Sequence, residues 1–130
     1  MSNNIIKISA AVLCIIIFAA LLPLIIVQSS YLSLGVAEKN IVSFEIVEYE
    51  NEPFYSPTVS RTVYSDPNTV LLLQTNINNE SAAYIEGNKS NKMIFIFYDD
   101  ETILNGYIDE EKIGLDYGRV WIKVDWDNII

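Results

Sequence analysis

An unbroken apolar run near the amino terminus constrains this chain more than any other feature. In the twenty residues from Ile8 to Val27, only Ser9 and Pro23 are not plainly apolar. Twenty helical residues, rising 1.5 Å each, cover about 30 Å, which is the thickness of the hydrocarbon core of a bilayer. The sequence therefore predicts a single transmembrane anchor helix within residues 1–37, and a separate domain formed by residues 38–130.

The charges on the two sides of this run predict an orientation. Lys7 is one of 8 basic residues, so 7 basic and all 17 acidic residues follow the run, and the domain carries a charge of about −10. Positive charge favours the cytoplasmic side of a membrane. We therefore expect a cytoplasmic amino terminus and an extracytoplasmic domain at the cell surface.

A cleaved secretory signal is the alternative interpretation of the same run. The small residues of Gly35-Val36-Ala37 fit the two positions that a signal peptidase reads. That site lies well beyond the apolar run, which is also longer than a usual signal core. The sequence favours a retained anchor, with a secreted domain as the alternative.

Composition excludes several classes of function. An acidic domain repels phosphate backbones, so we expect no nucleic-acid partner. The chain has no histidine and one cysteine, Cys14, inside the apolar run. Imidazole-dependent triads and most zinc or copper sites are thereby excluded, and neither a nucleophile motif nor a phosphate-binding glycine loop is present. We predict a protein that is not an enzyme and has no cofactor.

Beyond residue 40 the sequence consists of short runs rich in Val, Ile, Phe, Tyr and Thr, separated by turn-forming residues. Such runs are typical of β-strands. Seven short strands predict a mainly β fold, namely a small Ig-like antiparallel β-sandwich. The expected strands are Ile41–Tyr49, Thr58–Tyr64, Thr69–Asn76, Ala82–Glu86, Lys92–Tyr98, Thr102–Ile108 and Arg119–Trp126.

Two of these strands suggest a surface for association. The run Met93–Tyr98 is apolar on both faces, so a loop or a partner must cover its second face, where we place Ile94 and Ile96. Alternation in the last strand places Trp121 on the outward face with Lys123. We predict a protein partner or self-association, with Ile94, Ile96 and Trp121 as interface residues.

Two further motifs lie in polar stretches between the expected strands. The triplets Asn79-Glu80-Ser81 and Asn88-Lys89-Ser90 match the acceptor for N-glycosylation, which makes Asn79 and Asn88 candidate sites. The acidic groups Asp99-Asp100-Glu101 and Asp109-Glu110-Glu111 offer oxygen ligands for Ca²⁺, but their spacing does not match a helix-loop-helix calcium site. We interpret them as solvated loop charges.

The order of parts resembles that of archaeal type IV pilins, archaellins and the single-pass accessory proteins of the archaellum. The resemblance rests on the Ile-rich run Ile8–Val27, followed by an acidic β domain with Asn-x-Ser acceptors. It implies a helix that packs in a filament core or anchors the domain in a membrane. Lys7 is followed directly by Ile8, so the basic-plus-glycine cleavage site of a pilin is missing and an uncleaved anchor is favoured.

A second likeness is to the water-stress domain of late-embryogenesis-abundant proteins, which is also an anchored sandwich. It rests on Val70–Asn78, Ala83-Tyr84-Ile85 and Asn105-Gly106. Together these features predict a membrane-anchored structural or interaction protein, such as a pilin-like subunit or an accessory subunit of a complex. A β-sandwich that binds a small ligand or Ca²⁺ is the alternative.

Overall fold

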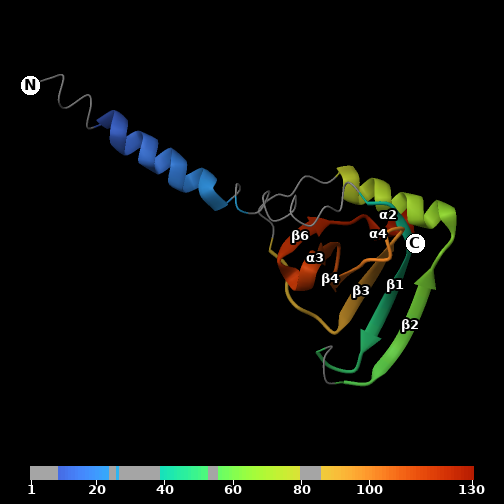
Figure 1. Cartoon of the computed structure of the whole chain (residues 1–130). Coiled ribbons are helices and arrows are strands. Elements are labelled where there is room, and N and C mark those ends of the chain that lie inside the picture. The colour runs from blue at the N-terminus through green and yellow to red at the C-terminus, as the bar shows by residue number, and fades with distance from the viewer. Residues whose placement is uncertain (1–8, 24–25, 27–38, 53–55, 80–85) are drawn as a thin grey trace, which may run out of the picture.

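The computed structural model describes residues 9–23, 26, 39–52, 56–79 and 86–130. Within these ranges the chain forms an amino-terminal helix at residues 9–23 and a β-rich domain (Figure 1). The domain is built on one six-stranded sheet in which every neighbouring pair of strands is antiparallel. The strand order is β2-β1-β3-β4-β5-β6, with β1 at Ile41–Tyr49, β2 at Thr58–Tyr64, β3 at Lys92–Tyr98, β4 at Ile103–Asp109, β5 at Lys112–Gly114 and β6 at Val120–Lys123.

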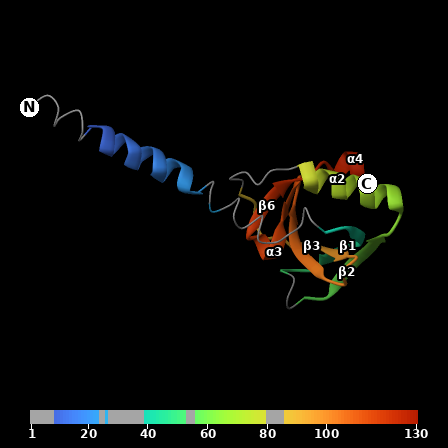
Figure 2. The ribbon, with the colours of Figure 1, turned by 45° about the horizontal axis from the view of Figure 1, so that its top comes forward.

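Helix α2, Pro67–Asn79, covers one face of this sheet (Figure 2). Asp66 caps its start, because Asp66 Oδ2 accepts a hydrogen bond from the backbone N–H of Thr69 at 3.2 Å. Pro67 occupies the first helical position, where its missing N–H costs nothing. Val70, Leu73 and Ile77 are spaced by three and four residues and form the buried stripe of the helix.

The predicted strand Thr69–Asn76 is wrong, because this segment is part of α2. Ser65-Asp66-Pro67-Asn68 has the composition of a turn, and here it is the cap and first turn of a helix. The run that follows is short and apolar, and periodicity alone does not separate a buried strand from a helix in such a run.

The Ig-like β-sandwich prediction is also wrong. The domain has a single sheet among the described residues, and α2 supplies the second layer in place of a second sheet. The main core lies between them, with the short helix α4, Trp126–Ile129, closing one end. Its fully buried side chains come from both layers and include Phe44, Leu73, Ile77, Ile94, Ile96, Ile113, Leu115 and Ile122.

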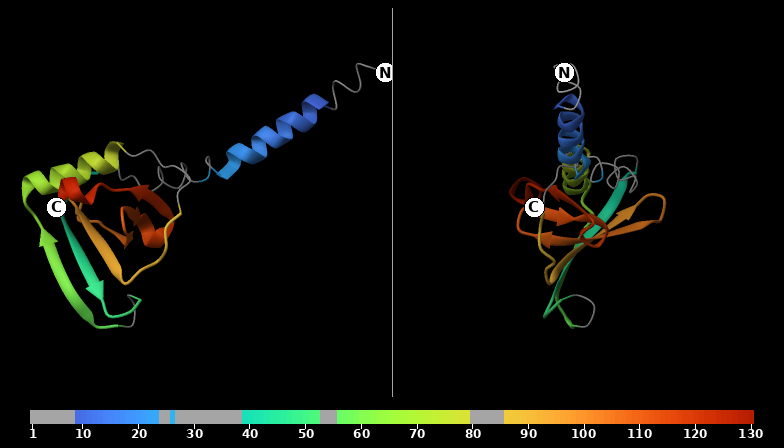
Figure 3. Two further views of the ribbon diagram at one scale, coloured as in Figure 1. Left: turned by 180° about the vertical axis from the view of Figure 1, so that it is seen from behind. Right: turned by 90° about the vertical axis from the view of Figure 1, so that its left-hand side faces the viewer.

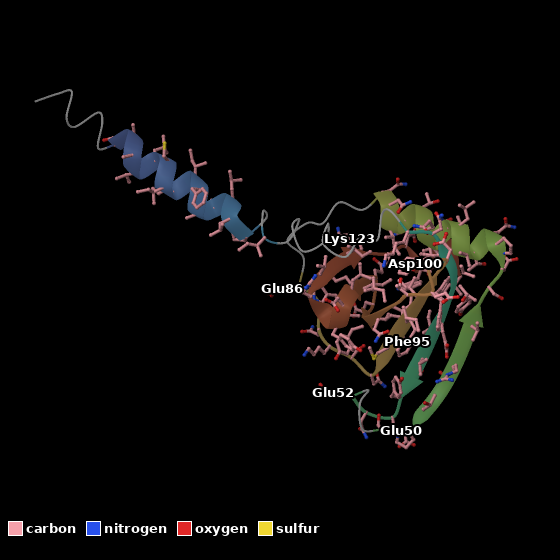
Figure 4. All side chains as sticks on the ribbon, viewed as in Figure 1. Glu50, Glu52, Glu86, Phe95, Asp100 and Lys123 are labelled. Carbon is pink, nitrogen blue, oxygen red and sulfur yellow. The ribbon has the colours of Figure 1, made fainter. Side chains whose placement is uncertain are left out.

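The opposite face of the sheet holds a second, smaller core. Met93, Tyr107 and Trp121 are buried there, with Tyr49 and Phe95 packed partly buried around them. Figure 4 labels Phe95 on β3. The short helix α3, Leu115–Gly118, connects β5 to β6 beside this cluster. A strand that is apolar on both faces is thus covered on both sides over part of its length by the domain itself.

Most of the other strand predictions match the observed elements closely. The strands Ile41–Tyr49, Thr58–Tyr64 and Lys92–Tyr98 have the predicted bounds, and Thr102–Ile108 is shifted by one residue. The last strand ends earlier than predicted, because α4 follows it, and β5 was not predicted. Of Ala82–Glu86, only Glu86 belongs to the described residues, and it lies outside any strand.

The predicted transmembrane helix requires a correction. Among the described residues, no helix is long and apolar enough to cross a membrane. The described helix covers residues 9–23, which is shorter than the predicted run Ile8–Val27. Residues 8, 24–25 and 27 of that run lie outside the described residues.

Candidate functional site

An open groove of about 840 Å³ lies on the face of the sheet that also carries the main core. Ile46 faces it from β1, opposite Thr62 of β2 and Ile94 of β3 in the ladder. The groove is therefore a continuation of the core face toward the β2 edge. Its lining comes from strands β1 to β4, the segment before β3, the β4–β5 turn, helix α4 and the last residue, namely Ile46, Glu48, Ser60, Thr62, Tyr64, Ser90, Asn91, Lys92, Ile108, Asp109, Glu110, Trp126, Asp127 and Ile130.

Negative charge dominates the rim of this groove. Four carboxylates line it, from Glu48, Asp109, Glu110 and Asp127, against the single ammonium group of Lys92. None of the ion pairs between described residues involves these five groups; they join Lys39 to Asp100, Arg61 to Glu45 and Arg119 to Asp116. The groove therefore presents an uncompensated negative field to a ligand.

Hydrogen bonds to the backbone hold the rim in place. Asn91 and Tyr49 exchange two bonds of 2.8 Å, one between their backbones and one from the Asn91 side chain to the Tyr49 carbonyl. Asp109 Oδ2 accepts a hydrogen bond of 2.8 Å from the backbone N–H of Asn88. Ser90 Oγ donates to the carbonyl of Ile108. These bonds fix the backbone next to Glu48 and Lys92 and orient the carboxylate of Asp109.

Trp126 forms part of the wall on the α4 side. Its indole Nε1 is buried and has no hydrogen-bond acceptor among the described residues. A buried donor without a partner costs about 1–3 kcal/mol.

Strand β2 borders the groove and is an open edge of the sheet (Figure 3). Its first six residues are exposed, including Val59 at 61% and Val63 at 59%. A register shift near Val59 interrupts the pairing with β1, so the regular part of the edge runs from Ser60 to Tyr64. This edge contains no proline and no lysine, and its one charged residue, Arg61, is paired with Glu45.

The opposite edge, at β6, is protected. The side-chain amide of Asn76 in α2 donates to the carbonyl of Lys123 at 2.9 Å and accepts from the N–H of Asp125 at 3.1 Å. It satisfies backbone groups at the end of β6 as a neighbouring strand would. Of the two edges of the sheet, β2 is the longer, with 7 residues against 4 in β6, and the end of β6 is bonded to Asn76.

The predicted interface residues lie elsewhere. Ile94 and Ile96 are completely buried in the main core, so the face we expected to be outward is the core face. Trp121 was expected to be exposed, but only 8% of it is accessible. Three glycines flank its ring, and a β-carbon on Gly114 would stand 2.7 Å from Trp121 Cζ2. The predicted interface residues Ile94, Ile96 and Trp121 do not line the groove.

The candidate glycosylation residues Asn79 and Asn88 are both exposed. Asn79 is the last residue of α2, and Asn88 lies in the segment that leads to β3. Neither residue lines the groove, although the backbone N–H of Asn88 donates to the rim carboxylate of Asp109. Their modification stays a prediction.

The groove itself was not predicted from the sequence. One signal was the acidic run Asp109-Glu110-Glu111, which we interpreted as solvated loop charge. The fold brings its first two carboxylates to the same groove as Glu48 and Asp127. No group of three or more His, Cys, Asp or Glu side chains among the described residues has a geometry that could hold a metal ion. The groove carboxylates are thus spread along a rim rather than gathered around one point.

Comparison with known proteins yields no match to a protein-family model, to a curated protein or to a solved structure.

Proposed function

We propose that this protein is a membrane-attached interaction protein. Its apolar amino-terminal helix inserts into the apolar part of a lipid bilayer, and its β domain offers the acidic groove and the β2 edge to a partner. The observation that carries the proposal is the helix at residues 9–23, whose side chains are all exposed although nearly all are apolar.

The exposed apolar side chains point in every direction around the helix axis. Val12, Leu13, Ile15 and Phe18 are each at least half exposed, and successive helical residues are separated by about 100°. Such a helix has no polar face to turn toward water. Burial of each large side chain is worth about 1.5–3 kcal/mol, so several together strongly favour transfer to an apolar environment. Lipid supplies that environment on all sides of the helix.

An interaction role for the domain is supported by its surface rather than by a reaction centre. The groove offers charge and shape but no imidazole, since the chain has no histidine. The single cysteine, Cys14, lies on the amino-terminal helix and away from the groove lining. Recognition of a charged partner uses these features directly.

Flotation with lipid vesicles tests membrane attachment. The full-length chain, mixed with phosphatidylcholine vesicles, is expected to float with the lipid in a density gradient. The double substitution Ile16→Lys and Ile17→Lys places two charges on the helix and should leave most of the protein in the dense fraction. The matched control, Val59→Lys and Val63→Lys, replaces two exposed apolar residues of the domain and should still float.

Equal flotation of all three proteins would show that the contact with lipid does not depend on the amino-terminal helix. Failure of the unmodified chain to float would contradict membrane attachment.

A further inference from the structure

We propose that strand β2 and the acidic groove together bind an extended basic segment of a partner protein, which joins the sheet as an additional strand next to β2. This inference names the partner class for the interaction role proposed above and rests on it. The observations that carry it are the open β2 edge and the negative groove on one side of that edge.

The edge supplies the backbone contacts. In a sheet, alternate residues of an edge strand direct their N–H and C=O groups away from the neighbouring strand. No strand or helix of the described chain pairs with the outer side of β2. An added strand would lie about 4.8 Å from β2 and would satisfy these groups. The edge at β6 is shorter, with 4 residues, and Asn76 already bonds the carbonyl of its last residue, Lys123.

The groove determines which side chains the added strand must carry. Ser60, Thr62 and Tyr64 of β2 line the groove, so every second side chain of an added strand would lie on the same face. That face carries four carboxylates and one ammonium group, and none of the five forms an ion pair with another described residue. Lysine or arginine at alternate positions therefore complements it.

The other face of β2 has a different character. Val59 and Val63 are exposed there, while the charge of Arg61 between them is paired with Glu45, the two groups lying 2.6 Å apart. The remaining side chains of the added strand would thus meet aliphatic surface and no free charge. The expected partner sequence alternates basic and apolar residues.

A second copy of this chain is a poor occupant of the same site. Its net charge is −9, and its own β2 contains one basic residue, Arg61, which is already paired. Two acidic grooves would approach each other in such a dimer. Charge complementarity therefore favours a basic partner over self-pairing.

A designed peptide tests the proposal with the full-length chain in detergent micelles. The probe is an acetylated octapeptide of alternating lysine and valine, and its partner probe replaces lysine with glutamate. Binding is measured from backbone amide chemical shifts of the isotope-labelled protein. We expect the lysine peptide to shift the amides of β2 and the groove rim, and to bind more weakly as salt is raised. The glutamate peptide should cause no such shifts.

Two N-methylated versions of the lysine peptide test strand addition itself. One carries N-methyl groups on its lysines and the other on its valines, so each removes one alternate set of N–H donors. Because only one set faces β2, one version should lose binding and the other should retain it. Equal binding by both versions would exclude strand addition.

Charge variants test the groove. The triple substitution Glu48→Gln, Glu110→Gln and Asp127→Asn neutralises three groove carboxylates. It should weaken binding of the lysine peptide about tenfold, the combined effect of three surface charge pairs. The control Glu50→Gln, Glu86→Gln and Glu101→Gln removes the same charge from sites outside the groove lining and should leave affinity nearly unchanged. Figure 4 labels Glu50 at the loop end of the β1–β2 hairpin and Glu86 at the margin of the domain that faces the amino-terminal helix in this view.

If the two charge variants lost the same affinity for the lysine peptide, the net charge of the protein would explain the loss. That result would overturn the proposed groove contact. An absence of binding by the lysine peptide would overturn the inference while leaving the flotation result intact, so the two proposals fail separately.

Discussion

The indole ring of Trp121 lies against Gly87 so closely that a β-carbon on Gly87 would stand 2.4 Å from Cε3 of the ring. Gly114, on the neighbouring strand, is packed against the other side of the same residue's ring system, where a β-carbon would stand 2.7 Å from Cζ2. The absence of side chains at these two positions makes the space that the ring occupies. Trp121 thus fills a pocket in the second core of the domain.

Substitution of Gly114→Ala is expected to destabilise the domain by about 1–3 kcal/mol, because the added methyl group overlaps the indole. The loss should shrink when the ring is removed by Trp121→Ala, since the two positions share one contact. Urea unfolding of the four proteins of this double-mutant cycle measures the coupling free energy.

Gly118→Ala is the control for the cycle. Its φ of +83° disfavours any side chain, while its added β-carbon would lie at an ordinary 3.4 Å from Trp121. The cost should therefore stay the same after Trp121→Ala. Additive costs at Gly114 would contradict the proposed overlap.

Helix α2 offers a matched pair of substitutions. Leu73 is completely buried against the sheet, whereas Leu71 in the same helix is 62% exposed. Leu73→Ala should cost about 2–5 kcal/mol of unfolding free energy through the lost burial and the cavity left behind. Leu71→Ala should change stability by less than about 0.5 kcal/mol. Chemical denaturation monitored by tryptophan fluorescence measures both, and equal costs would contradict the packing of α2 as the second layer.

Strands β1, β2 and β3 were predictable because their β-branched and aromatic residues are bounded by turn-forming residues on both sides. Helix α2 was not, since a run of three leucines between valine and glutamine carries no clear period. Its cap, Asp66 before Pro67, was the signal that distinguishes the two structures. Because Asp66 was assigned to a turn, the segment after it was predicted as a strand instead of a helix. The additional strand then supported a second sheet in the predicted fold.

The buried side of β3 gives another test of this correction. Ile94→Lys places a charge in the main core, where Ile94 is completely buried, and should prevent stable folding of the domain. Ile103→Lys, on the neighbouring strand at 56% exposure, should leave the fold intact. The dispersion of backbone amide chemical shifts in NMR spectra of the two proteins shows whether each variant is folded. A folded Ile94→Lys protein that only loses association would restore the original interface prediction.

The groove was harder to predict than the fold, for a geometric reason. Its carboxylates come from the end of β1, the β4–β5 turn and the carboxyl-terminal helix. Glu48 and Asp127 can be assigned to the same groove only when the strand order of the sheet is known. Alternation along single strands assigns faces, but it does not reveal which face an unpredicted helix covers.

The turn after β3 predicts a pH dependence. Hydrogen bonds from the Thr102 side chain and backbone hold the pKa of Asp100 below its usual value, with a smaller contribution from the charge of Lys39, whose Nζ lies 3.5 Å from the carboxylate. Thr102→Val removes the hydroxyl donor, so the pKa of Asp100 should rise toward that of an ordinary aspartate, near 4. Carbon NMR of the Asp100 carboxyl group during an acid titration measures the change.

The sign of the stability effect follows from the lowered pKa. A carboxyl group whose pKa is lower in the folded state than in the unfolded state stabilises the fold above the unfolded pKa, and this contribution is lost as the pH falls through the folded value. The stability difference between the original protein and Thr102→Val should therefore be largest near neutral pH and should narrow as the pH falls below about 4. Lys39→Met is the matched comparison, and it should raise the pKa of Asp100 by less than Thr102→Val does, because the side-chain hydrogen bond of Thr102 is the largest single cause of the lowered pKa and the contributions of Lys39 are the smallest. A larger rise after Lys39→Met would show that charge, rather than the turn's hydrogen bonds, controls this carboxyl group.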